Sequence, residues 1–320
     1  MATANDITGQ TRGVYTISPT PFTERGEIDF KSTDMLVDFY LNHDVDGLTI
    51  LGMLGEASKL SPAESSAFMG YVLARMDGRK PVIIGASNAG TDNLVTFARE
   101  ARDKGAAGIM VAPVAGLNSD ERVYDYWARL LERLGPDIPV CYQDYPKTTG
   151  VSTSVEVLNR LIDGFENLVM LKHEQESGLG KITRIRETAA AAGRRRISIL
   201  IGNGGLYLSQ ELGRGVDGAM TGFAFPEMLV QVCRAFFDGK ADAAEDIFDI
   251  YLPILRYEQQ FGIGLAIRKE ILRRRGAIAS ATVRHPGPLL NDRDHAEIGA
   301  LLARLERKLA AAQAGDVVPA

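Results

Sequence analysis

The chain has 320 residues, of which 45% are hydrophobic and 24% charged, and its formal net charge is −5. These totals predict a globular protein with one large α/β domain plus an appendage, or with two ordinary domains, and the negative charge argues against a general binder of nucleic acid or anionic membranes. Residues 1–12 are polar and no apolar run approaches the length of a membrane span, so we expect no signal peptide, no membrane segment and a cytoplasmic location.

The cysteines and histidines do not suggest a disulfide framework or a metal site. Cys141 and Cys233 lie far apart in apolar segments without metal-ligand neighbours, which is typical of a reducing compartment. The four histidines are scattered, and no pair has the spacing of metal ligands. We therefore predict no metal.

From residue 13 onward, short apolar segments alternate with amphipathic ones. Strands are predicted at residues 13–19, 47–52, 81–86, 108–113, 138–145, 168–174, 198–203 and 218–222. Helices are predicted between them, for example at residues 30–43, 62–76, 91–104, 120–134 and 153–162. The segment Ser61-Pro62-Ala63-Glu64 has the N-cap, first-position proline and capping glutamate of a helix start.

Eight strands, each followed by a helix, predict a (β/α)8 barrel over residues 13–240. An open doubly wound sheet is the alternative, but no Gly-x-Gly-x-x-Gly opens the first helix. Beyond the eighth unit, residues 241–260, 262–275 and 288–312 read as helices without strands. We interpret residues 241–312 as a C-terminal helical region packed on the barrel.

Lys172 interrupts the predicted strand at residues 168–174 after four apolar residues. Strand alternation places Lys172 on the face of Met170 and Glu174, and Val169, Leu171 and His173 on the other. A lysine at the carboxyl end of a buried strand is a candidate amine nucleophile, because burial favours its neutral form. The alternative is a strand-end lysine that reaches out to water.

Among the predicted strand ends, where barrel enzymes carry their active sites, Lys172 is the only lysine or arginine. The loop at residues 52–56 could present backbone N–H groups to a carboxylate, or could be an ordinary glycine turn. The loop at residues 202–205 could approach a ligand closely, or simply connect strand and helix. Tyr142 or Tyr145 could relay a proton, or belong to the core.

Several motifs together resemble the dihydrodipicolinate synthase / N-acetylneuraminate lyase family of class I aldolases. They are Thr20-Pro21-Phe22 with Gly26, Ile28 and Asp29; Gly52-x-x-Gly55-Glu56 with Leu60-Ser61-x-x-Glu64; Gly85-x-x-x-Ala89 with Thr91; Pro146 with Thr149-Gly150; Lys172; Gly218-Ala219 with Pro226; and Arg284-x-Pro286. The resemblance spans about residues 13–290. It implies a homotetramer built from dimers, without metal or organic cofactor.

By this resemblance, Lys172 forms a Schiff base with a 2-keto acid, usually pyruvate, and a tyrosine of the fifth strand shuttles protons. Tyr142 is the preferred relay, although counting back from Pro146 puts Gln143 in its place, and Tyr145 also stays open. The resemblance implies that the backbone of Met53, Leu54 and Gly55 binds the substrate carboxylate, and we also expect Gly202, Asn203 and Met220 to bind substrate.

The sequence also departs from the family pattern. Met53 and Leu54 replace two threonines, Val114 and Ala115 replace a tyrosine pair, and Thr148 replaces an arginine that holds a second carboxylate. We therefore expect aldol cleavage or condensation of pyruvate or another 2-keto acid, with a less polar aldehyde partner than the synthases use. The alternatives are dehydration of a 2-keto-3-deoxy sugar acid, 4-hydroxy-tetrahydrodipicolinate synthase proper, and a non-catalytic regulator that binds a keto acid.

Overall fold

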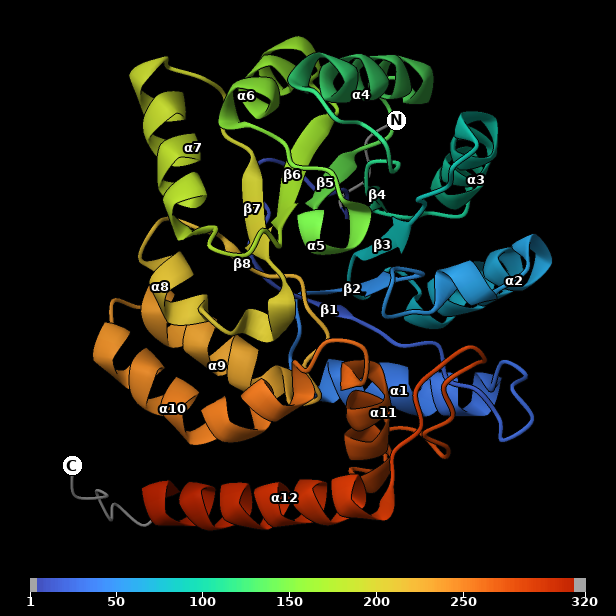
Figure 1. The fold of residues 1–320 in the computed structure, drawn as a ribbon, viewed down its shortest axis with the longest axis vertical. Helices are drawn as coiled ribbons and strands as arrows, with labels where there is room; N and C mark the ends of the chain where they lie inside the picture. The colour runs from blue at the N-terminus through green and yellow to red at the C-terminus, as the bar shows by residue number, and fades with distance from the viewer. Residues whose placement is uncertain (1–4, 314–320) are drawn as a thin grey trace.

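In the computed structural model, which describes residues 5–313, eight parallel strands close into a barrel in the order β1 to β8 (Figure 1). The strands are β1 (Gly13–Ile17), β2 (Gly47–Ile50), β3 (Val82–Gly85), β4 (Gly108–Val111), β5 (Val140–Asp144), β6 (Leu168–His173), β7 (Ser198–Ile201) and β8 (Gly218–Ala219). The predicted barrel is confirmed. Every strand ends earlier than expected, although backbone hydrogen bonds to the neighbouring strand continue after some of them, as from the N–H of Glu174 to the Asp144 oxygen.

Helices follow the strands and surround the barrel (Figure 1). They are α1 (Phe30–Asn42), α2 (Pro62–Met76), α3 (Thr91–Asp103), α4 (Asp120–Leu134), α5 (Pro146–Thr149), α6 (Val155–Gly164), α7 (Leu179–Ala191), α8 (Leu208–Leu212) and α9 (Pro226–Phe237), with the short 3-10 turns η1 (Ala57–Lys59) and η2 (Asn203–Gly205). The predicted start of α2 is confirmed, since Ser61 and Glu64 form a reciprocal capping box and Pro62 takes the first helical position.

Two hydrophobic clusters divide the core. The larger cluster contains helix residues such as Leu36 and Trp127 and therefore lies between the sheet and the helices. The smaller cluster alternates with it along the strands and so fills the barrel interior. Its buried members are Ile7, Tyr15, Ile17, Ile83, Ala107, Met110, Cys141, Met170, Leu200 and Met220.

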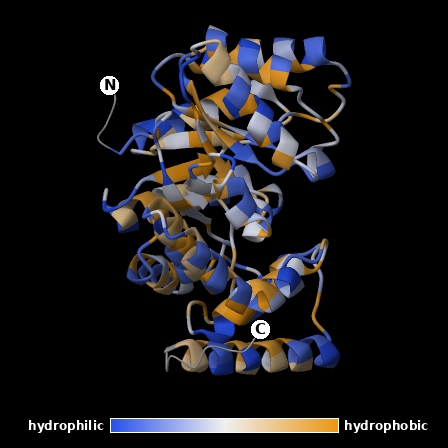
Figure 2. Ribbon diagram, turned by 90° about the vertical axis from the view of Figure 1, so that its left-hand side faces the viewer, coloured by the Kyte–Doolittle hydropathy of each residue, from blue (hydrophilic) through white to orange (hydrophobic). Residues whose placement is uncertain are grey.

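Three further helices follow the barrel without strands: α10 (Ala241–Glu258), α11 (Gly264–Arg274) and α12 (Asp292–Gln313). Helix α10 packs on α8 and α9 of the barrel and also contacts α11 and α12. Figure 2 shows α12 with hydrophobic and hydrophilic residues mixed along its length, and its Ile298 and Leu305 are buried. Within residues 5–313, no helix is both long and apolar enough to cross a membrane.

Candidate active site

Lys172 lies near the carboxyl end of β6 with its side chain inside the barrel mouth. The residue is only 3% exposed, and Met170, two positions before it, belongs to the interior cluster. Its Nζ lies 2.9 Å from Oε2 of Glu174, which is also buried. The expected common face of Met170, Lys172 and Glu174 is thus present. A buried amine is tolerated because a carboxylate compensates its charge.

The opposite face of β6 follows the expected alternation only in part. Leu171 packs in the outer cluster, but Val169 packs against the interior cluster instead of sharing the side of Leu171. The reason is a register shift between β5 and β6, where Val140 pairs with Leu168 but the next residue, Cys141, pairs with Met170. Val169 is therefore extra on its strand, and alternation across that point fails.

Gln143 completes the group around Lys172. It pairs in register with Lys172 on the neighbouring strand, and its Nε2 donates a 2.7 Å hydrogen bond to Oε2 of Glu174. Oε2 of Glu174 therefore accepts a hydrogen bond from the Gln143 amide and also lies beside the Lys172 amine. The sequence placed Glu174 on the correct face but gave it no role; its position two residues after the lysine on one strand was the available signal.

The Gly202 and Asn203 positions frame the Glu174 side chain. A Cβ atom added at Gly202 would lie 2.3 Å from both Cγ and Oε1 of Glu174, so only glycine leaves room for this carboxylate. Asn203 donates from Nδ2 to the backbone oxygen of Glu174 at 3.0 Å. Met220 is fully buried in the interior cluster below. Substrate contact by Gly202, Asn203 and Met220 stays a prediction.

Tyr142 points away from the lysine, contrary to its expected role as proton relay. Its ring stacks on Trp127 of α4 at a centroid distance of 4.1 Å, and its hydroxyl group bonds to that of Thr153. The strand register turns Gln143 toward Lys172 and therefore Tyr142 toward the helices. The hydroxyl group of Tyr142 is therefore engaged on the helix side of the sheet, away from Lys172.

Tyr145 is the tyrosine that remains near the site. It follows β5 directly and is half-buried. Burial and, to a smaller degree, the negative charge of Glu174 raise the pKa of Tyr145. Tyr145 therefore stays a candidate proton relay, and its role remains a prediction.

The loop after β2 is tightly shaped. Leu51 and Glu56 at its ends both have left-handed backbone conformations, with φ of 56° and 55°. Residues other than glycine rarely adopt this conformation. The N–H of Gly55 donates to the Gly52 oxygen at 3.0 Å, so this expected carboxylate donor is already used within the turn. Among residues 5–313, no hydrogen bond from the N–H of Met53 or Leu54 is present, and these two groups remain as candidate donors.

Buried side chains hold this loop from outside. Oε1 of Glu56 lies 2.5 Å from Nζ of Lys269, which comes from α11. Lys269 also donates to the backbone oxygens of Thr20 and Thr282. Burial lowers the pKa of Lys269 to about 8, although the charge of Glu56 opposes this. The C-terminal helical region thus fixes the loop that faces the barrel mouth.

A second group of charged side chains lies behind β6. His173 points out of the barrel, as predicted, and its Nδ1 is 3.5 Å from Oδ2 of Asp144. Nζ of Lys181 on α7 lies 2.5 Å from the same oxygen. Burial would raise the pKa of the Asp144 carboxyl, but His173 and Lys181 outweigh it and hold that pKa below its usual range. This group anchors the strand ends that carry Gln143 and Lys172.

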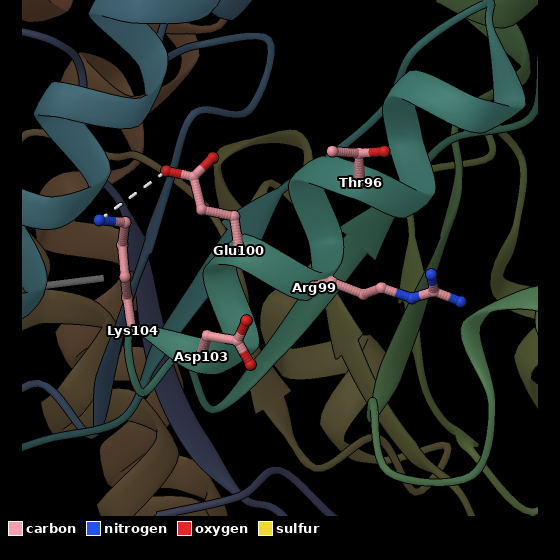
Figure 3. A pocket seen from close by; sticks show the side chains of 5 residues that line it. All are labelled: Thr96, Arg99, Glu100, Asp103 and Lys104. Atoms are coloured by element: carbon pink, nitrogen blue, oxygen red, sulfur yellow. Dashed lines mark ion pairs between the residues drawn. The ribbon is translucent and has the colours of Figure 1, made fainter.

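A shallow pocket of about 450 Å³ lies elsewhere, on the outer surface of α3 (Figure 3). It is lined by Thr96, Arg99, Glu100, Asp103 and Lys104. None of these residues faces the barrel interior. Within the described part of the chain, no group of three or more histidine, cysteine, aspartate or glutamate side chains is arranged to hold a metal ion.

Comparison with known families agrees with this geometry. The model of the Dihydrodipicolinate synthetase family matches residues 10–305. The chain belongs to this family. The resemblance to the dihydrodipicolinate synthase family is therefore confirmed, and the homologues of the chain in this family are enzymes.

Three relatives illustrate the range of the dihydrodipicolinate synthetase family. A dihydrodipicolinate synthase from Rhodopseudomonas palustris has 42% identity and a TM-score of 0.91, covering 94% of this chain and 100% of that one. The L-2-keto-3-deoxyarabonate dehydratase of Azospirillum brasilense is 29% identical over 299 residues, which cover 92% of this chain and 94% of that enzyme. YagE, a prophage protein from E. coli K12 crystallised in complex with pyruvate, has 25% identity and a TM-score of 0.83, covering 92% and 98%.

Proposed function

We propose that Lys172 forms a Schiff base with a 2-keto acid, pyruvate or a pyruvate-like compound, and that the chain is a lyase or synthase of this class. The observation that carries the proposal is the buried pair of Lys172 and Glu174, 2.9 Å apart at the carboxyl end of a barrel strand. This end is where barrel enzymes carry their active sites. The complex of YagE with pyruvate supports the substrate class.

The side chains around Lys172 suit amine chemistry. The lysine must lose a proton before its nitrogen can attack, and Glu174 is within hydrogen-bond reach to accept it. The nitrogen then bonds to C2 of the keto acid, and the keto oxygen leaves as water. The resulting iminium draws electrons from the neighbouring bonds, so that a carbon–carbon bond can break or form through an enamine.

The substrate carboxylate has a candidate position at the loop after β2. The N–H groups of Met53 and Leu54 are the donors there, because the N–H of Gly55 is used within the turn. Leu54 also packs against the interior cluster. We infer that this loop presents its backbone N–H groups to the anion and its apolar side chains to the rest of the substrate.

A specific observation favours dehydration as the reaction. The base beside Lys172 is a carboxylate, and a carboxyl group can both take a proton and return it. Glu174 would remove the C3 proton of a 2-keto-3-deoxy sugar acid, and the enamine would expel the C4 hydroxyl group, which leaves as water with the returned proton. Hydrolysis of the iminium restores Lys172. One relative that spans nearly all of both chains, the Azospirillum brasilense enzyme, is a dehydratase of this kind.

Borohydride trapping tests the Schiff base. The protein is incubated with pyruvate and reduced, and its intact mass is measured; we expect one reduced adduct per chain, and peptide mapping should place it on Lys172. Lys172→Ala should remove the adduct, whereas Lys104→Ala, which removes a lysine on the outer surface that pairs with Glu100, should keep it. A folded wild-type protein that gives no adduct would contradict the proposal and favour the non-catalytic regulator.

Product analysis separates the reactions. A panel of 2-keto-3-deoxy sugar acids is supplied, and released aldehyde is measured beside loss of water. Dehydration releases no aldehyde, whereas aldol cleavage releases one aldehyde and pyruvate. Condensation of pyruvate with aspartate semialdehyde at about 1–10³ s⁻¹ would instead identify the synthase reaction.

A homotetramer and a cytoplasmic location are part of this proposal. Sedimentation of the purified full chain tests the first. A monomer at all concentrations would contradict it, and among the structural neighbours one is a monomeric dihydrodipicolinate synthase variant.

A further inference from the structure

Arg268 is a buried arginine of α11 that enters the barrel rim from the C-terminal helical region. The residue is 2% exposed. Its Nε lies 2.5 Å from Oε1 of Glu258 on α10, and Oε2 of Glu258 accepts a 3.1 Å hydrogen bond from the N–H of Ala224. Glu258 therefore fixes the orientation of the guanidinium group and ties it to the segment after β8.

The Nη1 atom of Arg268 has no hydrogen-bond partner among residues 5–313, although it is buried. A buried donor without a partner costs about 1–3 kcal/mol, and more when the group is charged. Most buried polar groups in folded proteins have a hydrogen-bond partner. A buried guanidinium donor at the rim of the candidate active site is therefore a candidate to donate to a bound substrate.

Gly222 shows where this donor points. A Cβ added at Gly222 would lie 2.8 Å from Nη1 of Arg268, 2.8 Å from the backbone oxygen of Ile17 and 3.1 Å from Cδ1 of Leu54. Gly222 lies three residues after the end of β8 and two after Met220, which belongs to the cluster inside the barrel. Nη1 therefore lies at the rim where the ends of β8 and β1 meet the loop after β2.

We propose that Nη1 of Arg268 donates a hydrogen bond to the carboxylate of the 2-keto acid held at Lys172. The carboxylate would thus receive one side-chain donor from Arg268 and backbone donors from Met53 and Leu54. This proposal rests on the proposed function. It adds Arg268 as the residue that makes binding depend on the carboxylate group of the substrate. The C-terminal helical region then contributes directly to the substrate site.

The chemistry of the group supports a carboxylate as the acceptor. A guanidinium forms strong, directed hydrogen bonds to carboxylates and keeps its charge at any working pH. Glu258 occupies Nε and leaves Nη1 for a second acceptor. Leu54 lies beside the same point as Nη1, so the loop that offers backbone N–H groups and the guanidinium approach one anion from two sides.

The test compares pyruvate with methyl pyruvate, which has the same keto group but no carboxylate. The readout is the concentration of each compound that gives half-maximal borohydride-trapped adduct on Lys172. The variant is Arg268→Met combined with Glu258→Gln, because removing the arginine alone would leave a buried unpaired carboxylate. We expect the value for pyruvate to rise about 10- to 100-fold and the value for methyl pyruvate to stay nearly unchanged. Equal losses for both compounds would overturn the proposal.

A second variant keeps the ion pair and moves the donor. Gly222→Ala introduces a methyl group 2.8 Å from Nη1, and we expect the same selective loss for pyruvate. The matched control is Arg273→Met on the same helix, since Arg273 pairs with Glu270 and is 45% exposed; it should change neither value. A loss with Arg273→Met equal to that of the Arg268 variant would also overturn the proposal.

The two proposals can fail separately. If the wild-type protein yields no adduct with either compound, the Schiff base is wrong. Pyruvate binding to unreduced protein is then measured by ligand-observed NMR. Binding that disappears in the Arg268→Met, Glu258→Gln variant but survives in Arg273→Met supports the carboxylate contact without the Schiff base, and binding that persists in both variants overturns it.

Discussion

The amine of Lys172, near the end of β6, and the carboxylate of Glu174, the residue directly after that strand, lie 2.9 Å apart. Neighbouring side chains on one strand face are separated by one intervening residue, so a Lys-x-Glu segment is enough to bring the pair together. Removal of either partner would leave a buried charge, which is strongly unfavourable. One segment, the end of β6 and the residue after it, therefore carries both the candidate nucleophile and its candidate proton acceptor.

Glu174→Gln should lower turnover by about 10²- to 10⁴-fold, because the amide keeps the volume but cannot accept a proton. The adduct on Lys172 should still form, but more slowly. The measurement is steady-state turnover of the substrate identified by the product panel, beside the rate of borohydride trapping. Glu176→Gln, an exposed glutamate paired with Lys147, is the control and should retain activity. Full turnover by Glu174→Gln would exclude this carboxylate as the base.

Gly202→Ala should displace Glu174, since the added Cβ would lie 2.3 Å from its Cγ and Oε1. We expect turnover to fall about as far as in Glu174→Gln, while circular dichroism and the melting temperature show a folded protein. Gly180→Ala on α7 is the matched control, because a Cβ there meets nothing within 4 Å. An active Gly202→Ala enzyme would mean that the position of Glu174 is not critical.

The two tyrosines of this region should respond differently to loss of their hydroxyl groups. Tyr142→Phe should keep its turnover and lose about 0.5–1.5 kcal/mol of unfolding free energy, because only the hydrogen bond to Thr153 disappears. Tyr145→Phe should lower turnover by about 10²-fold if the phenol transfers a proton. Urea unfolding and turnover of both variants distinguish these outcomes. A greater loss of turnover in Tyr142→Phe would reverse the assignment.

The ion pair between Glu64 and Arg284 should make stability depend on acid pH. Hydrogen bonds from Arg284 lower the pKa of Glu64 to about 2, against 4.5 for the unperturbed group. The folded chain therefore holds the proton less readily than the unfolded chain, so the stabilisation is present above pH 4.5 and is lost as the pH falls toward 2.

Urea unfolding at pH 6 and pH 3 checks this sign. Because the Glu64 side chain is 35% exposed, we expect Glu64→Gln to cost only about 1 kcal/mol at pH 6 and less at pH 3. The control is Glu306→Gln, an exposed position on α12, which should change little at either pH. A cost for Glu64→Gln that grows toward pH 3 would contradict the prediction.

Local sequence patterns were enough to predict the barrel fold and to single out Lys172. Turn residues and apolar runs marked all eight strands, and the Ser61 to Glu64 segment predicted the start of α2 because its capping bonds are local. Lys172 stood out because a lysine is rarely buried in an apolar strand unless it has a charged partner or a function. These features depend on residues that are close in sequence.

The identity of the residue beside Lys172 could not be predicted from the sequence. The register shift between β5 and β6 decides whether Tyr142 or Gln143 faces the lysine, and the pairing of two strands is a tertiary property. Arg268 and Lys269 likewise reach the barrel rim from α11, far along the chain. The sequence by itself determined the barrel and singled out Lys172 as the candidate nucleophile, since periodicity and burial are encoded locally. Only the tertiary structure decided which side chains surround that nucleophile, because strand register and helix docking join residues that are distant in sequence.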